Sequence, residues 1–179
     1  MSGMPDPLAA GGLWNWHIAA YVDGVRVRTA IAAVLDRPVV PLGAVPADDG
    51  AVLCDVWHTG GEFPTQVDCY LIPGDVAEPT AASAVAVRLG HDCLFADNTL
   101  NPTRFVLAEP NGTLRAVHAD EIETDEGTEH SNVRPCTGAE PSCATWPGCD
   151  QPADPQAGVS AGTPADPPAG SPGPETAAA

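Results

Sequence analysis

The chain has 179 residues, enough for one domain of ordinary size and a further segment, and it is strongly acidic. It contains 24 acidic residues, seven arginines and no lysine, which gives a formal net charge of -17. This charge argues against a basic surface that binds nucleic-acid phosphates and against attraction to anionic lipid, and it favours partners with a cationic surface.

The absence of lysine, together with abundant alanine, glycine, proline, valine and aspartate, is typical of a GC-rich genome, so we expect a bacterial or phage protein. No segment reaches the roughly 18 apolar residues of a membrane span, and residues 1–13 lack the basic and apolar regions of a signal peptide. We therefore expect a cytoplasmic protein that does not bind membranes. Its six cysteines should then be free thiols rather than a disulfide framework.

Residues 1–12 contain two prolines and no periodicity, which predicts a flexible arm. Residues 13–22 are rich in aromatic and β-branched side chains, which predicts a strand. Because strand side chains alternate, Trp14 and Trp16 should share one face and His17 the other. We expect the two tryptophans to be buried in the core.

The dipeptide Asp23-Gly24 allows two interpretations of the next segment. It is a common hairpin turn, and Val25 to Arg28 alternate as a strand would. An apolar stripe at helical spacing favours a helix over 24–36 with Asp23 as its N-cap; the stripe consists of Val27, Ala30, Ile31, Val34 and Leu35.

Strands are predicted at 39–42, limited by its proline, at 51–58, which is apolar on both faces, and at 67–72. A small-residue helix follows, with Glu78 as its cap and Pro79 as its first residue. Gly90 ends this helix.

A strand at 92–96 precedes a hairpin of residues 104–108 and 113–117, which turns at Asn111-Gly112. We expect one inner face of this hairpin to carry the following side chains: Phe105, Leu107, Leu114 and Ala116.

These elements predict a compact α+β domain over 13–119, with a mainly antiparallel sheet of five to six strands and two helices on one face. A similar run of residues in each half also suggests two β-α-β-β repeats. The alternative is an all-antiparallel roll with a hairpin at Asp23-Gly24. After residue 119 the chain has eleven acidic residues, one arginine and half of all the prolines, so residues 120–179 should form a disordered acidic tail.

One candidate metal site lies within this tail. Zinc favours thiolate and imidazole ligands, and a Cys3His set could organise an otherwise unfolded segment. The residues of the candidate set are His130, Cys136, Cys143 and Cys149. The set lacks the short Cys-x-x-Cys spacing of recognisable zinc motifs, so we favour exposed free thiols and assign no metal site from the sequence.

A second candidate is a nucleophilic thiol, with Cys54 assisted by His58 or His91. Alternation places Cys54 and His58 on one strand face and Asp55 on the other, so a triad cannot form locally. A buried structural cysteine is the competing interpretation.

No established catalytic or phosphate-binding signature is present, so we assign no catalytic residue and no cofactor. The leading functional hypothesis is a non-catalytic interaction or accessory protein whose folded domain binds another protein and whose acidic tail contacts cationic surfaces. Nucleic-acid mimicry is a special case of it. The alternatives are a small enzyme or ligand-binding domain and a zinc-binding tail.

Overall fold

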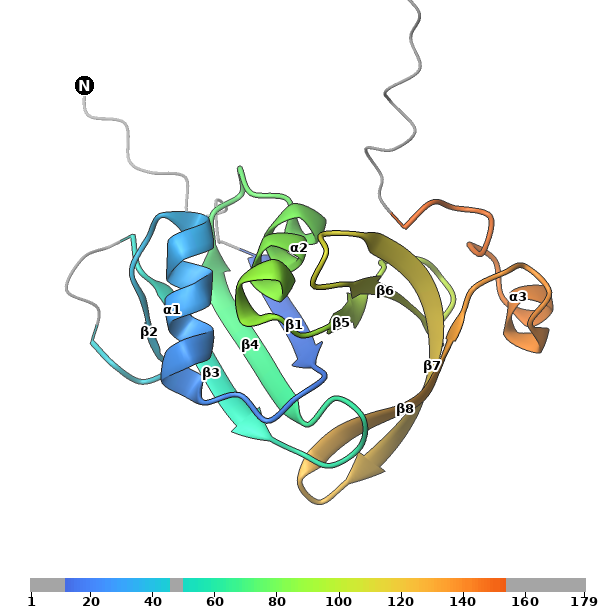
Figure 1. Ribbon diagram of the computed structural model, residues 1–179, viewed down its shortest axis with the longest axis horizontal. Helices are drawn as coiled ribbons and strands as arrows, with labels where there is room; N and C mark the ends of the chain where they lie inside the picture. Colours follow the sequence, from blue (N-terminus) through green and yellow to red (C-terminus); the bar gives the residue numbers. More distant parts are fainter. Residues whose placement is uncertain (1–11, 46–49, 154–179) are drawn as a thin grey trace, which may run out of the picture.

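The computed structural model describes residues 12–45 and 50–153 (Figure 1). Within them the chain forms eight strands and three helices. Their bounds, in chain order, are β1 (Gly12–Ile18), α1 (Gly24–Leu35), β2 (Val39–Pro41), β3 (Val52–His58), β4 (Thr65–Ile72), α2 (Glu78–Leu89), β5 (Cys93–Ala96), β6 (Arg104–Ala108), β7 (Leu114–Thr124), β8 (Gly127–Pro135) and α3 (Pro141–Thr145). The predicted arm lies outside the described residues except for Gly12.

The eight strands form a single sheet in the order β2-β3-β4-β1-β5-β6-β7-β8. All neighbours are antiparallel except β2 and β3. The predicted class, α+β with a mainly antiparallel sheet, is therefore confirmed. The predicted number of strands is too small, because the sheet continues into the segment expected to be a tail.

The antiparallel pair β1 and β4 lies in the middle of the sheet. From β1 to β6 the elements follow the order strand, helix, strand, strand twice. The connection from β1 to β2 crosses β4 and β3, and the connection from β4 to β5 crosses β1. Both crossings carry a helix, and α1 and α2 lie side by side on one face of the sheet (Figure 1).

The helix α1 confirms the helical interpretation of the segment after Asp23. The Asp23 side chain accepts a hydrogen bond from the Val25 backbone N–H at 2.8 Å and so caps the helix. The helix buries Val27, Ile31 and Leu35 against the sheet. The hairpin alternative is wrong here, because residues at this spacing share one buried face only when the segment is a helix.

The start of α2 differs from the prediction. Glu78 is the first helical residue and Ala77 occupies the N-cap position without a side-chain hydrogen bond. The Glu78 carboxylate instead accepts a hydrogen bond from Trp16 Nε1 at 2.9 Å. A buried indole N–H requires a partner, and this requirement outweighs capping at Glu78.

The core occupies both faces of the sheet. Trp14 and Trp16 stack with ring centroids 5.1 Å apart and are buried, as the alternation predicted. The predicted inner face of the β6–β7 hairpin is wrong, because Phe105 lies opposite Val117 and Leu114 lies opposite Ala108. The strand β6 is buried on both faces, so apolar residues of both parities point into a core and sequence alternation could not choose between them.

Strands β7 and β8 curl away from the plane of β1 to β4, on the side away from the helices (Figure 1). The register between them shifts at His118 and Asp120, a bulge that bends a sheet. The curled end of β8 meets the β3–β4 loop, where the Glu62 N–H donates to the His130 carbonyl at 3.0 Å. Gly61 permits this approach, since its φ is +78° and a Cβ there would lie 2.8 Å from the same carbonyl oxygen.

The folded part of the chain therefore continues past the predicted boundary at residue 119. The strand β7 reaches Thr124, and β8 and α3 follow it. Most of the acidic side chains of the hairpin are exposed, whereas His130 and Ala119 are buried in the sheet. High net charge does not prevent a hairpin from forming when the charges lie on its exposed positions. Residues 154–179 of the predicted tail lie outside the described residues.

None of the helices in the described part of the chain is long and apolar enough to cross a membrane.

Candidate metal centre

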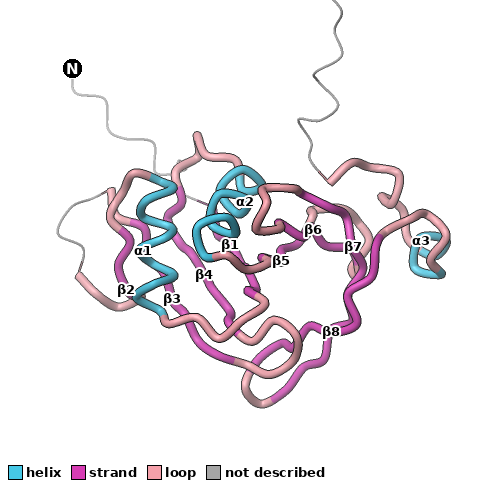
Figure 2. Tube along the Cα trace, in the orientation of Figure 1, coloured by secondary structure: helices cyan, strands magenta, loops and turns pink. Residues whose placement is uncertain are grey.

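Four side chains converge where the last described segment folds back on the sheet. They come from β7 (His118), the residue after β8 (Cys136), α3 (Cys143) and the loop after α3 (Cys149), and their ligand atoms lie within 4.8 Å of one another. Figure 2 shows how β8 leads through a loop to α3 beside β7. Within the described residues this is the single group of three or more possible metal ligands that lies this close together.

Two of three distances between the ligand atoms match the corners of a tetrahedral zinc site, and the third is shorter. The Sγ atoms of Cys136 and Cys143 are 3.8 Å apart, and His118 Nε2 lies 3.8 Å from Cys149 Sγ and 3.1 Å from Cys143 Sγ. Zinc binds sulfur at about 2.3 Å and imidazole nitrogen at about 2.0–2.1 Å, so ligands at tetrahedral corners are separated by about 3.5–3.8 Å. A disulfide would require about 2.0 Å between sulfurs, and all three cysteines are free.

Antiparallel pairing of β7 and β8 brings the first two ligands together. His118 lies opposite Arg134, and the Cys136 N–H donates to the Ala116 carbonyl at 3.0 Å. Residues two apart on a strand share a face, so the side chains of His118 and Cys136 project to the same side as diagonal neighbours. The 17 intervening residues in the sequence form the hairpin that brings them together.

A chain of hydrogen bonds sets the tautomer of His118. The Thr103 backbone N–H can only donate, so its 3.0 Å contact identifies Asn101 Oδ1 as an acceptor. The Thr103 hydroxyl also donates to Asn101 Oδ1, at 2.9 Å. The hydroxyl must therefore accept at its 3.1 Å contact with His118 Nδ1, which places the imidazole proton on Nδ1 and leaves the Nε2 lone pair facing the sulfurs.

The same asparagine fixes the last cysteine. Its Nδ2 donates to Cys149 Sγ at 3.2 Å and to the Ser142 carbonyl at 3.3 Å. Asn101 is 2 % exposed. One buried amide thus connects the histidine, α3 and the loop after it, which is the role of an outer-shell residue in a metal site.

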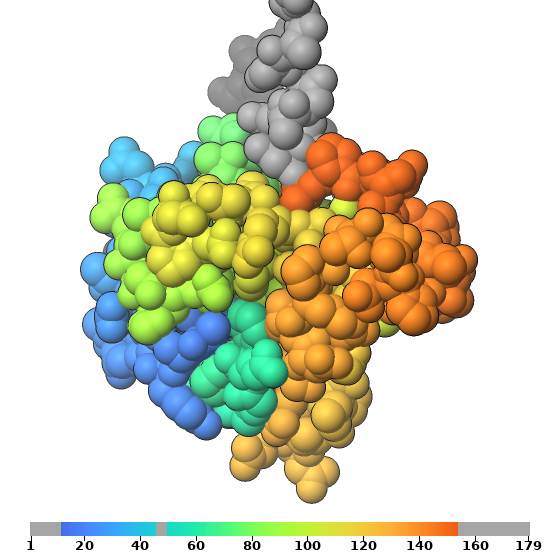
Figure 3. Space-filling view, turned by 45° about the vertical axis from the view of Figure 1, so that its right-hand side comes forward, coloured from blue at the N-terminus to red at the C-terminus, as the bar shows by residue number. Residues whose placement is uncertain are grey.

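The segment after Cys149 is attached to the sheet as well. The buried Arg104 guanidinium pairs with Asp97 at 2.5 Å and donates from Nη2 to the Gln151 carbonyl. Ala153 packs against the core under the helices. In Figure 3 residues 136–153, coloured orange to red, form one continuous lobe beside β7.

The ionisation of the ligands suits metal binding. Burial lowers the pKa of His118, which keeps its imidazole neutral at pH 7. Burial raises the pKa of Cys143, but hydrogen bonds from Cys149, Cys136 and nearby backbone outweigh this, and the net shift is downward. Burial, followed by the hydrogen bond to Cys143, raises the pKa of Cys149 to about 11. Without a cation, Cys143 is thus the favoured thiolate and Cys149 the thiol that donates to it.

His130 is not part of this cluster, although it was the histidine of the sequence-based set. Its ring packs on the opposite face of the sheet, 4.1 Å from the His17 ring and edge-on to Phe105. Its Nε2 lies 3.2 Å from Glu121 Oε1. Three of the four predicted ligands therefore come together, and His118, which the sequence analysis missed, supplies the fourth.

The candidate nucleophile, Cys54, is not accessible to a substrate. Cys54 is fully buried in the core beneath the helices. His58 is exposed at the end of β3, where its Nε2 lies 3.1 Å from the Val22 carbonyl oxygen, and His91 lies in the turn after α2. A nucleophilic thiol must be reachable by its substrate, so the structure does not support this triad.

Comparison of the chain with models of protein families, with curated proteins and with solved structures gives no significant match. The site must therefore be interpreted from its own chemistry.

Proposed function

We propose that this chain is a zinc-binding protein in which His118, Cys136, Cys143 and Cys149 bind one Zn²⁺ ion. The observation that supports it most directly is the convergence of these four ligand atoms within 4.8 Å. Free thiols that merely share a surface have no reason to surround a common point together with a neutral imidazole nitrogen.

The donor set favours zinc over other common cations. Three sulfurs and one imidazole nitrogen in tetrahedral arrangement suit zinc, whereas magnesium and calcium prefer oxygen ligands. With four protein ligands there is no open position for a substrate or a water molecule. Such a closed set is typical of a structural rather than a catalytic zinc site.

In this proposal, zinc stabilises the folded arrangement of residues 136–153. The helix α3 has only five residues and buries no side chain, so it cannot be stable by itself. Zinc would join this helix and its loops to β7 through His118. Its binding free energy would then contribute to folding of the segment.

Metal analysis of the purified full-length chain tests the proposal. We expect one zinc ion per chain, retained through gel filtration. Replacement by Co²⁺ should give the visible absorption bands of a tetrahedral thiolate site. A protein that binds neither ion, although it is folded and its thiols are reduced, would reject the assignment.

A second candidate function is binding of a partner protein with a cationic surface. It is supported by the β7–β8 hairpin, whose acidic side chains Glu123, Asp125 and Glu126 form no ion pair with any described residue. Asp55 and Asp68 also lie directly opposite each other on the sheet face away from the helices, an unfavourable arrangement for like charges. A cationic segment would relieve this repulsion.

Fluorescence anisotropy with a labelled arginine-rich peptide tests the second candidate. We expect binding that weakens as the salt concentration rises. The variants E123Q/E126Q and D55N/D68N change the net charge equally, so they distinguish the hairpin from the open sheet face. If both variants bind the peptide equally more weakly, binding depends only on the overall charge of the protein, and a specific binding surface is contradicted.

A further inference from the structure

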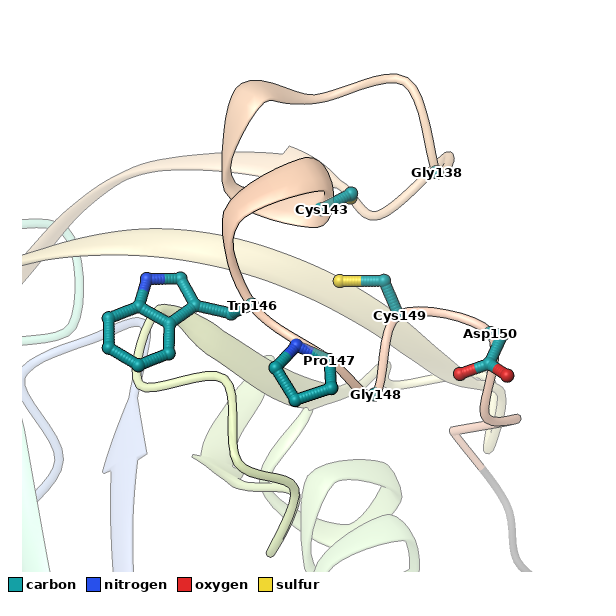
Figure 4. A pocket seen from close by; sticks show the side chains of 7 residues that line it. All are labelled: Gly138, Cys143, Trp146, Pro147, Gly148, Cys149 and Asp150. Carbon is teal, nitrogen blue, oxygen red and sulfur yellow. The ribbon is translucent and has the colours of Figure 1, made fainter.

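A pocket opens directly onto the sulfur ligands. It has a volume of about 310 Å³, and it is lined by Gly138, Cys143, Trp146, Pro147, Gly148, Cys149 and Asp150. Figure 4 shows Cys143 on α3 above Cys149 on the following loop, with Trp146 and Pro147 at one side. A small solute can therefore reach two of the three sulfurs, although the histidine ligand is fully buried.

We propose that the site is a modification site for hydroperoxides, which oxidise Cys143 and Cys136 to a disulfide and so release the zinc ion. This rests on the zinc site proposed above. Cys143 lines the pocket, and its Sγ lies 3.8 Å from that of Cys136. Bond formation requires the sulfurs to approach to about 2.0 Å. A Cβ added at Gly138, in the segment between them, would meet open space.

The oxidation is balanced in two steps. In the first, the Cys143 thiolate attacks the O–O bond of the hydroperoxide, an S–O bond forms, and the leaving oxygen takes a proton. In the second, the Cys136 thiolate attacks the sulfenic sulfur, the S–S bond forms, and hydroxide leaves and is protonated to water. The two thiolates lose two electrons and the hydroperoxide gains them. Only His118 and Cys149 would then remain as ligands, so the zinc ion would dissociate into solvent.

The other three thiols are protected from the same reagent. Cys54, Cys69 and Cys93 have exposed fractions of 0, 0 and 1 %. They lie in the core under the helices. Burial also raises the pKa of Cys93 well above the usual range, so this thiol stays protonated. Oxidation should therefore be selective for the zinc ligands.

Loss of zinc would detach a defined part of the molecule. Residues 136–153 contact the sheet through the Cys149 and Ser142 contacts of Asn101 and through the Gln151 contact of Arg104. When two ligands are lost, the segment is held only by these hydrogen bonds and by three further contacts: the Cys136 N–H bond to the Ala116 carbonyl, the ion pair of Glu140 with Arg134, and the packing of Ala153 on the core. The switch would thus uncover the buried pair of Arg104 and Asp97.

The test uses reduced, full-length protein loaded with zinc. Hydrogen peroxide is added stepwise, released zinc is measured with a chromogenic chelator, and cysteines are mapped by mass spectrometry after unfolding in an alkylating reagent. We expect bound zinc to fall from one ion per chain to none. A Cys136–Cys143 cross-link, lighter by two hydrogens, should appear, and reductant with zinc should reverse both changes.

The buried cysteines serve as the internal control. After unfolding they should react completely with the alkylating reagent, because peroxide has not oxidised them. Protein that binds zinc and keeps it in excess peroxide would overturn the switch alone, as would a cross-link that maps to other cysteines. Protein that binds no zinc before peroxide is added would overturn the zinc site and, with it, the switch.

Discussion

At the scale of single residues, the candidate metal centre depends on which face of a strand a histidine occupies. His118 and His130 are both almost completely buried and both have neutral rings at pH 7, since burial lowers the pKa of each. Alternation along β7 and β8 and the bulge after His118 put them on opposite faces of the sheet. Only His118 lies on the face that the cysteines reach.

The matched variants His118→Asn and His130→Asn test this difference. His118→Asn should lower the zinc affinity by more than the roughly 10–100-fold that loss of an outer-shell partner costs. His130→Asn should leave the affinity within a few-fold while lowering thermal stability. Competition with a zinc chelator measures both affinities. A larger loss of zinc affinity in His130→Asn than in His118→Asn would identify His130 as the ligand, as the sequence suggested.

Asn101 should act as an outer-shell positioning residue. Asn101→Ala removes the donor to Cys149 and the acceptor that orients Thr103, so zinc should bind about 10–100-fold more weakly. Asn111→Ala, which removes a 2.8 Å hydrogen bond in the β6–β7 turn, is the control and should bind zinc normally. Chelator competition and the spectrum of the Co²⁺ form give the two readouts. An unchanged spectrum and affinity in Asn101→Ala would exclude the outer-shell role.

His17 should make stability depend on pH. Burial, with a further contribution from His130, lowers its pKa from 6.5 to about 3. Between these values the unfolded chain binds a proton that the folded chain does not, so the free energy of unfolding falls as the pH falls, by up to about 1.4 kcal/mol per pH unit. His17→Phe should make this dependence shallower in urea unfolding between pH 6.5 and pH 4. An equal slope in both proteins would contradict the shifted pKa.

At the scale of elements, the turn after α3 shows how closely residues 136–153, which carry the three cysteines, pack on the sheet. Gly148 has a φ of +104°, and a Cβ there would lie 2.8 Å from the Thr99 Cβ. Gly138, at the other end of the segment, also has a positive φ, +79°, but a Cβ there would meet open space. The two glycines therefore separate the effect of backbone strain from that of a steric clash.

Gly148→Ala should weaken zinc binding more than Gly138→Ala does. Both alanines incur the cost of a left-handed backbone, about 1 kcal/mol, but only the first must push Thr99 away from the loop that carries Cys149. Zinc affinity by chelator competition and melting temperature compare the two variants. Equal losses would mean that the loop does not pack on Thr99 in solution.

At the scale of the whole molecule, the proposed zinc site divides the described residues into a core that should fold without metal and a segment, residues 136–153, that should depend on it. The helices and the central strands share a large apolar core, with Trp16, Ile31 and Phe95 among its fully buried side chains. Residues 136–153 add mainly hydrogen bonds and one small apolar contact, Ala153. Removal of zinc should therefore affect the two parts differently.

Hydrogen exchange with and without a chelator measures this difference. Amides of residues 136–153 should lose protection when zinc is removed, whereas those of α1 and β4 should keep it. The chelator alone, added to His118→Asn protein, is the control and should change little. Uniform loss of protection across α1 and β4 would show that the metal supports the whole fold.

The sequence by itself determined those elements in which local chemistry and burial agree. The Asp23 cap, the apolar stripe of α1 and the Asn111-Gly112 turn each specify their structure within a few neighbouring residues. The sequence also identified Cys136, Cys143 and Cys149 as members of one candidate ligand set. The histidine that joins them was not identified, because nearness in sequence favoured His130.

Only the tertiary structure showed that folded elements continue past residue 119 and that His118 is the histidine that joins the cysteines. The acidic residues after position 119 counted against folding when taken as a total, but β7 and β8 place most of them on exposed positions. His118 lies beside Cys136 through pairing of the two strands, and sequence alone gives neither that register nor the bulge that shifts it. The physical reason is that a side chain's face depends on the register of its strand, which a sheet fixes through contacts between distant residues.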